Sequence, residues 1–153
     1  MRFLVVSLRN HTLRGFSTVS TPDNSEALLA APEICVLATV NPDGSAHAMP
    51  MWYIYEEGKI WIMTGPGSQK FKNVRRTGLA TVTLDLREPP YYAIMVKGTA
   101  ETGGNLDPER QFRIVSRYIS EERARAYVEK MSTREVGSIV VTPKKIVEFH
   151  GNA

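Results

Sequence analysis

The chain has 153 residues, 42% of them hydrophobic, with a formal net charge of +3. This length is typical of one domain, and no apolar run approaches the roughly 20 residues of a membrane-spanning helix. Arg2, Arg9 and Arg14 precede the first acidic residue, Asp23, so the other 16 basic residues balance the 16 acidic ones, and a neutral body argues against nucleic-acid binding.

Residues 1–21 are rich in Arg, Ser and Thr and contain no acidic residue, as in organelle transit peptides. A disordered extension, or a start codon assigned too far upstream, would give the same composition. We expect a basic, flexible extension over 1–21 and one cofactor-binding domain over 22–153. Cys35 is the only cysteine, which excludes an intrachain disulfide and fits a reducing cytoplasm.

Helices and strands follow from the local patterns. Thr21 and Pro22 are a typical N-cap and first residue of a helix, which Pro32 ends. Further helices are predicted at Ser68–Arg76, from Pro108 (capped by Asp107) to about Ile119, and at Glu121–Met131. Apolar, β-branched runs predict six strands, namely Ile34–Val40, Ala46–Tyr55, Ile60–Thr64, Leu79–Leu86, Tyr91–Thr102 and Ser138–Phe149.

Most of the connections between these strands are short turns, which favours antiparallel pairing. Pro50 has no N–H for a strand ladder, so we expect an edge or a bulge within the second strand. Six strands with the helices set aside predict a mainly β (α+β) fold, a small closed or split antiparallel barrel with flanking helices.

The sharpest local signal is the break Gly65–Lys70 (GPGSQK) between a strand and a basic helix. The start of a helix presents unpaired N–H groups and partial positive charge, which bind anions. Ser68 adds a hydroxyl and Lys70 a full charge, with Arg75 and Arg76 one turn further on. The pattern indicates a phosphate site, although a plain strand-to-helix turn with a solvated basic face would also produce it.

Two common phosphate motifs are excluded at this break. A Walker A loop needs Gly directly before its Lys and Ser or Thr directly after it, but Gln69 and Phe71 flank Lys70. A dinucleotide fingerprint needs a third Gly where Lys70 stands. The histidines His11, His47 and His150 lack the spacing of metal ligands, so no metal site is expected, and no side chain is assigned as catalytic.

Five segments in order carry a family resemblance: the strand from Ile34, the NPDG turn, the MWY segment, GSQK-x-x-N-x-RR and KGTAE. Together they resemble the pyridoxamine-phosphate-oxidase-like split-barrel flavoproteins, and within these the small deazaflavin- or FMN-dependent oxidoreductases of actinobacterial type. The resemblance covers about Ile34–Glu101 and, more loosely, the last strand. It implies a six-stranded antiparallel Greek-key split β-barrel.

The resemblance also implies a homodimer with two cofactors between its subunits. The cofactor would be the deazaflavin F420 or, next, FMN, exchanging hydride with a small organic substrate and needing no nucleic acid or membrane. Ala48–Tyr53 would lie along the ring, and Ser68–Lys70 would hold the phosphate. Tyr92 or Ala93 would approach from the other subunit. The implied cofactor-binding residues are Met49, Pro50, Met51, Trp52, Met63, Thr64, Ser68, Gln69, Lys70, Asn73, Arg76 and Tyr92.

The sequence departs from the family pattern in two places. Gln69 stands where many FMN-binding relatives have Arg, which removes one phosphate-binding cation. The C-terminal Trp- and Arg-containing segment of true pyridoxamine-phosphate oxidases is not recognisable, so that activity is not expected. A non-catalytic flavin or haem carrier, with His47 or His150 as axial ligand, is the alternative on the same barrel, and a structural barrel with an empty site is a third.

Overall fold

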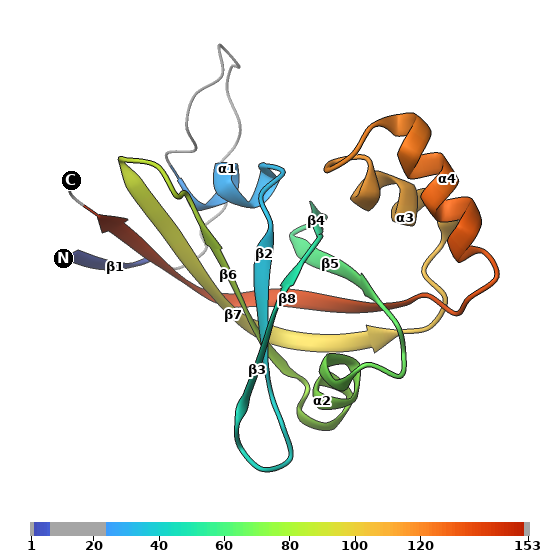
Figure 1. Cartoon of the computed structure of the whole chain (residues 1–153). Coiled ribbons are helices and arrows are strands. Elements are labelled where there is room, and N and C mark those ends of the chain that lie inside the picture. Colours follow the sequence, from blue (N-terminus) through green and yellow to red (C-terminus); the bar gives the residue numbers. More distant parts are fainter. Residues whose placement is uncertain (1, 7–23, 152–153) are drawn as a thin grey trace.

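The computed structural model describes residues 2–6 and 24–151 and shows a mainly β protein with four helices in that part of the chain (Figure 1). The strands are β1 Arg2–Val6, β2 Cys35–Val40, β3 Ala46–Met51, β4 Ile54–Glu56, β5 Lys59–Thr64, β6 Leu79–Asp85, β7 Tyr91–Gly103 and β8 Gly137–Gly151. The helices are α1 Ser25–Ala30, α2 Gln69–Thr77, α3 Pro108–Val115 and α4 Glu121–Met131.

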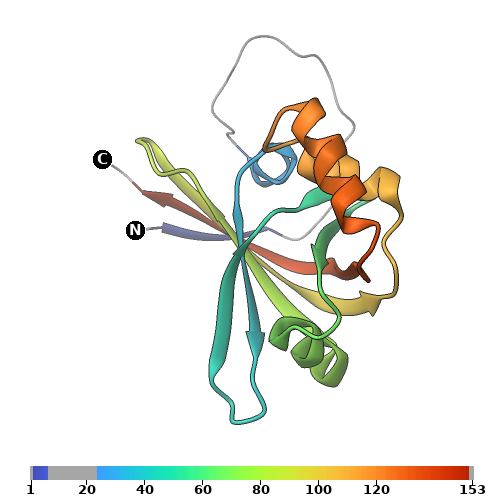
Figure 2. The ribbon, with the colours of Figure 1, turned by 45° about the vertical axis from the view of Figure 1, so that its right-hand side comes forward.

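The strands form one sheet in the order β3-β2-β6-β7-β8-β5-β4, with β1 also paired to β8. Every pairing is antiparallel. The sheet curls into a half-barrel, and α2 and the α3–α4 hairpin lie at its lower and upper ends in both views (Figures 1 and 2). The predicted fold class is confirmed, with more strands than the six expected.

The extra strand within the barrel arises because the predicted strand Ala46–Tyr55 is two strands. β3 pairs with β2 and β4 pairs with β5, so one stretch of chain supplies both ends of the sheet. Between them the Tyr53 N–H donates to the Tyr118 hydroxyl, which donates to the Tyr53 carbonyl, each over 3.1 Å. A side chain from the turn after α3 therefore replaces a strand neighbour at the break.

The N-terminal region differs from the sequence prediction at the first helix. α1 begins at Ser25, and the Asn24 side chain caps it by accepting from the Ala27 N–H over 2.8 Å. The predicted N-cap at Thr21 is therefore wrong, because Asn24 competes for the same role closer to the helix. Apart from β1, the predicted extension over 1–21 lies outside the described residues, and the domain division stays a prediction.

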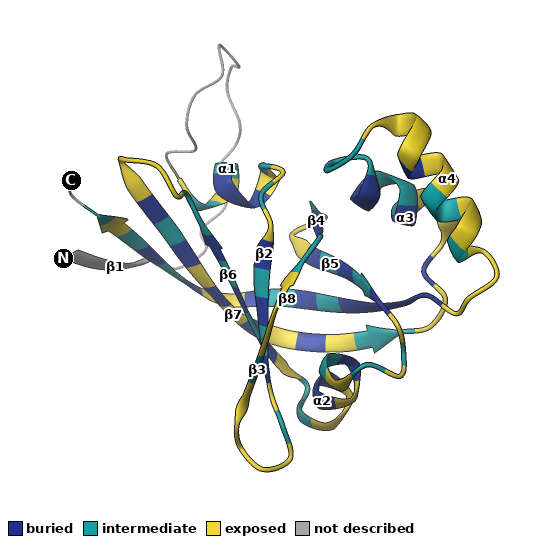
Figure 3. Ribbon diagram, viewed as in Figure 1, coloured by how far each residue is buried: buried dark blue, intermediate teal, exposed yellow. Residues whose placement is uncertain are grey.

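The core lies inside the curl of the sheet, where residues of β2, β5, β6 and most of β7 are buried in alternation (Figure 3). Leu28 and Leu29 of α1 and Phe71 and Val74 of α2 pack against it. Burial raises the pKa of Cys35 to about 12, so its thiol stays neutral and unreactive near pH 7. A second apolar cluster, formed by Ile54, Leu106, Ile114 and Val136, seats the α3–α4 hairpin on β4 and β5.

The α3 helix begins as predicted, because Asp107 accepts from the Arg110 N–H over 2.8 Å and Pro108 occupies the first turn. It ends at Val115 rather than near Ile119, and the following turn presents Tyr118 to the barrel. No helix in the described ranges is both long and apolar enough to cross a membrane.

Candidate functional site

The first turn of α2 lies directly after β5 and forms an uncapped corner. The Ser68 N–H donates to the Gly65 carbonyl over 3.0 Å, which closes the turn between strand and helix. Ser68 occupies the N-cap position, but its hydroxyl lies 3.1 Å from the Thr64 hydroxyl and makes no capping hydrogen bond. The first turn also contains no acidic residue. Its amide groups are therefore left for an anion.

Lys70 supplies a full positive charge at this corner. It is half-buried and forms no ion pair with any residue that the structure describes. Desolvation lowers the pKa of its ammonium below the usual value, and a nearby anion would offset that effect. A side chain at Gly65 or Gly67 would meet nothing within 4 Å, so open space adjoins the backbone on this side. The corner fits a group with several anionic oxygens.

Asn73 belongs to the scaffold beneath this corner. Its side chain is 1% exposed, donates to the Thr39 hydroxyl (3.1 Å) and to Asn41 Oδ1 (2.8 Å), and accepts from Gln69 Nε2 (2.8 Å). The Arg76 guanidinium likewise donates to the Val40 carbonyl at the end of β2. Both predicted site residues thus tie α2 to β2, and the contacts observed for them are internal.

The remaining predicted residues fall into two groups. Met63 and Thr64 end β5 beside the corner, whereas Met49, Pro50 and Met51 lie on β3, the strand next to β2. The β2–β3 turn and α2 both lie at the lower edge of the barrel (Figure 1).

Trp52 takes part in contacts that the sequence did not predict. Its ring stacks on Tyr118, with centroids 5.1 Å apart and planes 7° from parallel, and lies 6.2 Å from the Tyr127 ring. Trp52 therefore joins the β3–β4 break to the α3–α4 hairpin. No local signal identifies Tyr118 or Tyr127, because both are far from Trp52 in the sequence.

Tyr92 does not join the corner within one chain. It pairs with His150 near one end of β7, and their rings lie 4.9 Å apart. The other end of β7, Gly103, is next to the corner, because a side chain at Gly137 would meet both its carbonyl and Phe71. The strand between Tyr92 and Gly103 spans about 35 Å. Any joint action of Tyr92 with the corner needs a second copy of the chain.

Among the residues described, no group of three His, Cys, Asp or Glu side chains is placed to hold a metal ion. The comparison with known families is more informative. A family model described as pyridoxamine 5'-phosphate oxidase matches residues 21–150. The chain belongs to this family. This confirms the family that the five sequence segments and the split barrel indicated.

Solved structures of similar fold include two with names that mention a flavin-type cofactor. An F420 reductase is 23% identical with a TM-score of 0.63, over 82% of this chain and 98% of that one. A conserved hypothetical protein from Mycobacterium tuberculosis is 27% identical with a TM-score of 0.63, over 84% and 88%. An FAD-binding protein from Mesorhizobium loti is 17% identical with a TM-score of 0.57, over 83% and 92%. The comparison with curated proteins found no match.

Proposed function

We propose that this protein is an oxidoreductase that binds a flavin-type cofactor with its phosphate at the α2 corner. F420 is the preferred cofactor and FMN the next, and hydride passes to or from a small organic substrate. The observation that carries the proposal is the uncapped first turn of α2 beside Lys70, which forms no ion pair with any described residue. The structural neighbours named F420 reductase and FAD-binding protein support a cofactor of this class.

In this proposal the cofactor and the protein have different roles. When bound, the cofactor supplies the hydride chemistry, so the protein needs no acid–base pair of its own. The α2 amides, the Ser68 hydroxyl and Lys70 would bind the phosphate. Met63 and Thr64, together with Met49–Met51 on β3 and Trp52 just after it, would contact the ring and its side chain. These residues would orient the cofactor and exclude water, and none is assigned a catalytic proton transfer.

The charge at the corner favours F420 over FMN. The phosphodiester of F420 carries one negative charge, whereas a phosphomonoester such as that of FMN carries about 1.5 to 2 at pH 7. Lys70 is matched to one such charge, whereas Gln69 adds none because its amide is neutral, and that amide donates to Asn73. Arg76 is turned to the Val40 carbonyl. The corner therefore suits a singly charged phosphate better than a doubly charged one.

A homodimer would complete the site. One row on the side of the sheet away from the core runs across four strands through Pro50, Val36, Thr83 and Met95, and none of these residues is charged. Met95 is 38% exposed and Val40, on the same side of β2, is 48% exposed. Burying such a face against a second copy is favourable. The family resemblance implies that Tyr92 or Ala93 of the second copy would then approach the cofactor.

The deciding experiment is a fluorescence titration of the apo-protein with F420 and FMN side by side. We expect saturable binding of both, with F420 about tenfold tighter, a difference of about 1.4 kcal/mol. If neither F420 nor FMN bound saturably, the proposal would be wrong. A Soret band in the purified protein, with haem found by mass spectrometry, would favour the non-catalytic carrier.

Because the one cysteine, Cys35, is buried, we retain the cytoplasm as the expected compartment.

The homodimer is tested separately by sedimentation velocity. Met95→Glu places a charge in the apolar row and should yield monomers that bind cofactor weakly. Thr133→Glu adds the same charge to an exposed loop after α4 and should leave the dimer intact. A monomeric wild-type protein that still binds F420 would overturn the dimer but leave the cofactor assignment standing.

A further inference from the structure

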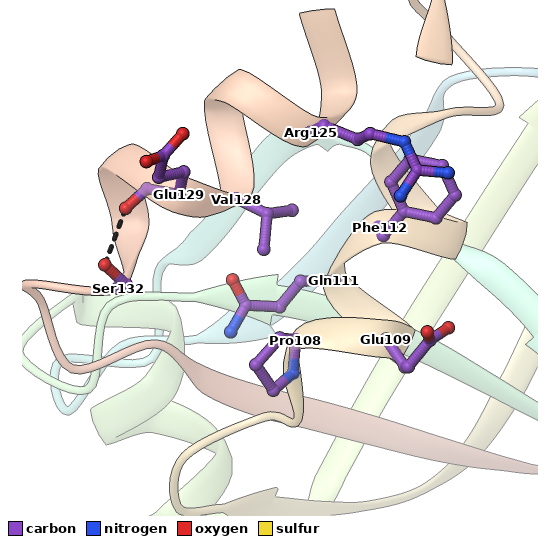
Figure 4. A pocket seen from close by; sticks show the side chains of 8 residues that line it. All are labelled: Pro108, Glu109, Gln111, Phe112, Arg125, Val128, Glu129 and Ser132. Carbon is purple, nitrogen blue, oxygen red and sulfur yellow. Dashed lines mark hydrogen bonds between the residues drawn. The ribbon is translucent and has the colours of Figure 1, made fainter. Parts of the chain in front are cut away.

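The α3–α4 hairpin encloses a hollow of about 600 Å³ that shares no residue with the α2 corner (Figure 4). This volume is in the range of sites for small organic ligands. Pro108, Phe112 and Val128 supply apolar walls, and Glu109 and Glu129 place carboxylates at the rim. The hollow is therefore an apolar space with acidic edges.

Gln111 lies at the inner side of this hollow and is 7% exposed. Its Nε2 donates to the Leu106 carbonyl over 2.7 Å. Because a carbonyl can only accept, this bond fixes the orientation of the amide and places Oε1 on the opposite side. Figure 4 shows that oxygen turned toward the underside of α4, below Glu129 and Ser132.

The Gln111 Oε1 atom is buried and has no hydrogen-bond partner among the residues that the structure describes. A buried acceptor without a donor destabilises the fold. Because the atom is inaccessible to solvent, a ligand in the hollow would reach it only after α4 side chains such as Val128 move aside. Gln111 Oε1 is thus an acceptor to which a ligand could donate a hydrogen bond.

The charges around the hollow select the donor. The ionisable residues of the lining are mainly acidic, namely Glu109 and Glu129, and Figure 4 shows the Glu129 carboxylate on the outer side of α4, away from Gln111. The one cation of the lining, Arg125, is placed over the Phe112 ring with its guanidinium carbon 4.6 Å from the centroid. Arg125 therefore extends the apolar wall as a stacked plane and leaves the acidic groups unneutralised.

We propose that this hollow is a second ligand site, one that binds a small organic ammonium with an apolar or aromatic body. The ammonium would donate to Gln111 Oε1 once the Val128 side chain moves aside, and the two acidic residues at the rim would favour its charge. The body would pack on Phe112 and Val128. The site is independent of the proposed cofactor at α2, so either can fail without the other.

The test uses the full chain and 2-phenylethylamine as the probe, followed by ¹H–¹⁵N NMR at pH 7. We expect saturable shifts confined to α3, α4 and the Gln111 side-chain amide, unaffected by added F420 or FMN. The isosteric alcohol 2-phenylethanol should bind at least about tenfold more weakly, since it lacks the charge. Equal binding of amine and alcohol, shifts elsewhere, or no saturable binding would each overturn the proposal.

Two variants examine the assigned groups. Gln111→Met keeps the length of the side chain but removes the acceptor, and should weaken amine binding about tenfold. Because it also removes the bond to Leu106, Glu129→Gln on the exposed rim provides the second test and should weaken binding about threefold. Glu135→Gln, an exposed neutralisation after α4, is the matched control and should change nothing. Equal effects of Glu129→Gln and Glu135→Gln would contradict the site.

Discussion

The α2 helix and the α3–α4 hairpin are both rich in basic residues but use them differently. In the hairpin region, Arg110 and Arg113 both bind the Glu56 carboxylate, at 3.2 and 2.8 Å, and Arg117 donates to the carbonyls of residues 30 and 31. In α2, Lys70 forms no ion pair in the part of the chain described. The hairpin uses these cations to hold the fold, whereas Lys70 of α2 has no such role among the described residues.

The difference depends on how each helix is attached to the barrel. α2 is anchored through the neutral Asn73 amide and by Arg76 on the uncharged Val40 carbonyl, and Gly78 caps its end with φ 66° and an N–H that donates to the Val74 carbonyl over 2.8 Å. The hairpin is anchored through charge, including Arg110 stacked 3.8 Å over the Trp61 ring. The number of basic residues in a helix therefore does not identify a phosphate site, but their partners do.

The largest expected effect comes from removing the neutral anchor of α2. Asn73→Ala deletes three buried hydrogen bonds and should lower the free energy of unfolding by about 3 kcal/mol, at about 1 kcal/mol for each bond. Urea denaturation measures this loss, with the neighbouring exposed Lys72→Ala as the control. If stability were unchanged and only cofactor affinity fell, Asn73 would contact the cofactor, as the family resemblance implied.

The Glu56 carboxylate, which anchors the hairpin through Arg110 and Arg113, should contribute somewhat less to the free energy of unfolding because water reaches it. Glu56→Gln weakens the hydrogen bonds from two arginines and should cost about 2 kcal/mol after solvent screening. Hydrogen bonds from Arg113, together with Arg110, hold the pKa of the Glu56 carboxyl below its ordinary value. Its contribution is therefore complete above pH 4.5 and is lost as pH falls through the lowered folded pKa. Unfolding free energies of wild type and Glu56→Gln should converge at low pH, and parallel curves would contradict this.

The sequence predicted the parts of the molecule that depend on local patterns. Strand periodicity located the barrel strands, and the Gly65–Ser68 break located the start of α2. The β3–β4 division was missed because the residue that replaces the strand partner of Tyr53 is Tyr118, 65 positions away. The anchoring role of Asn73 was missed for the same reason, since Thr39 is 34 positions away. Contacts of this range leave no periodic signal in the chain.

Lys70, which forms no ion pair with any described residue, should give the next largest effect when it is replaced. Lys70→Ala should weaken F420 and FMN binding about tenfold while stability stays nearly unchanged. Lys72→Ala, on the exposed side of the same helix, should have little effect. Burial lowers the pKa of Lys70 from 10.5, so cofactor affinity should fall as pH rises through that lowered value, when the ammonium loses its proton. Equal losses in the two variants, or a flat pH profile, would place the phosphate elsewhere.

The smallest effect tests why the corner should prefer one cofactor. Gln69→Arg adds a second cation beside Lys70 and retains a donor for Asn73. It should tighten FMN binding about threefold, as expected of a partly exposed ion pair, and F420 binding less, because the phosphodiester has only one charge. Gln69→Met is the matched control, which removes the amide without adding charge. Equal gains for both cofactors would mean that the ring side of the site, on β3, determines the preference. A gain for FMN alone would assign the preference to the charge at the α2 corner.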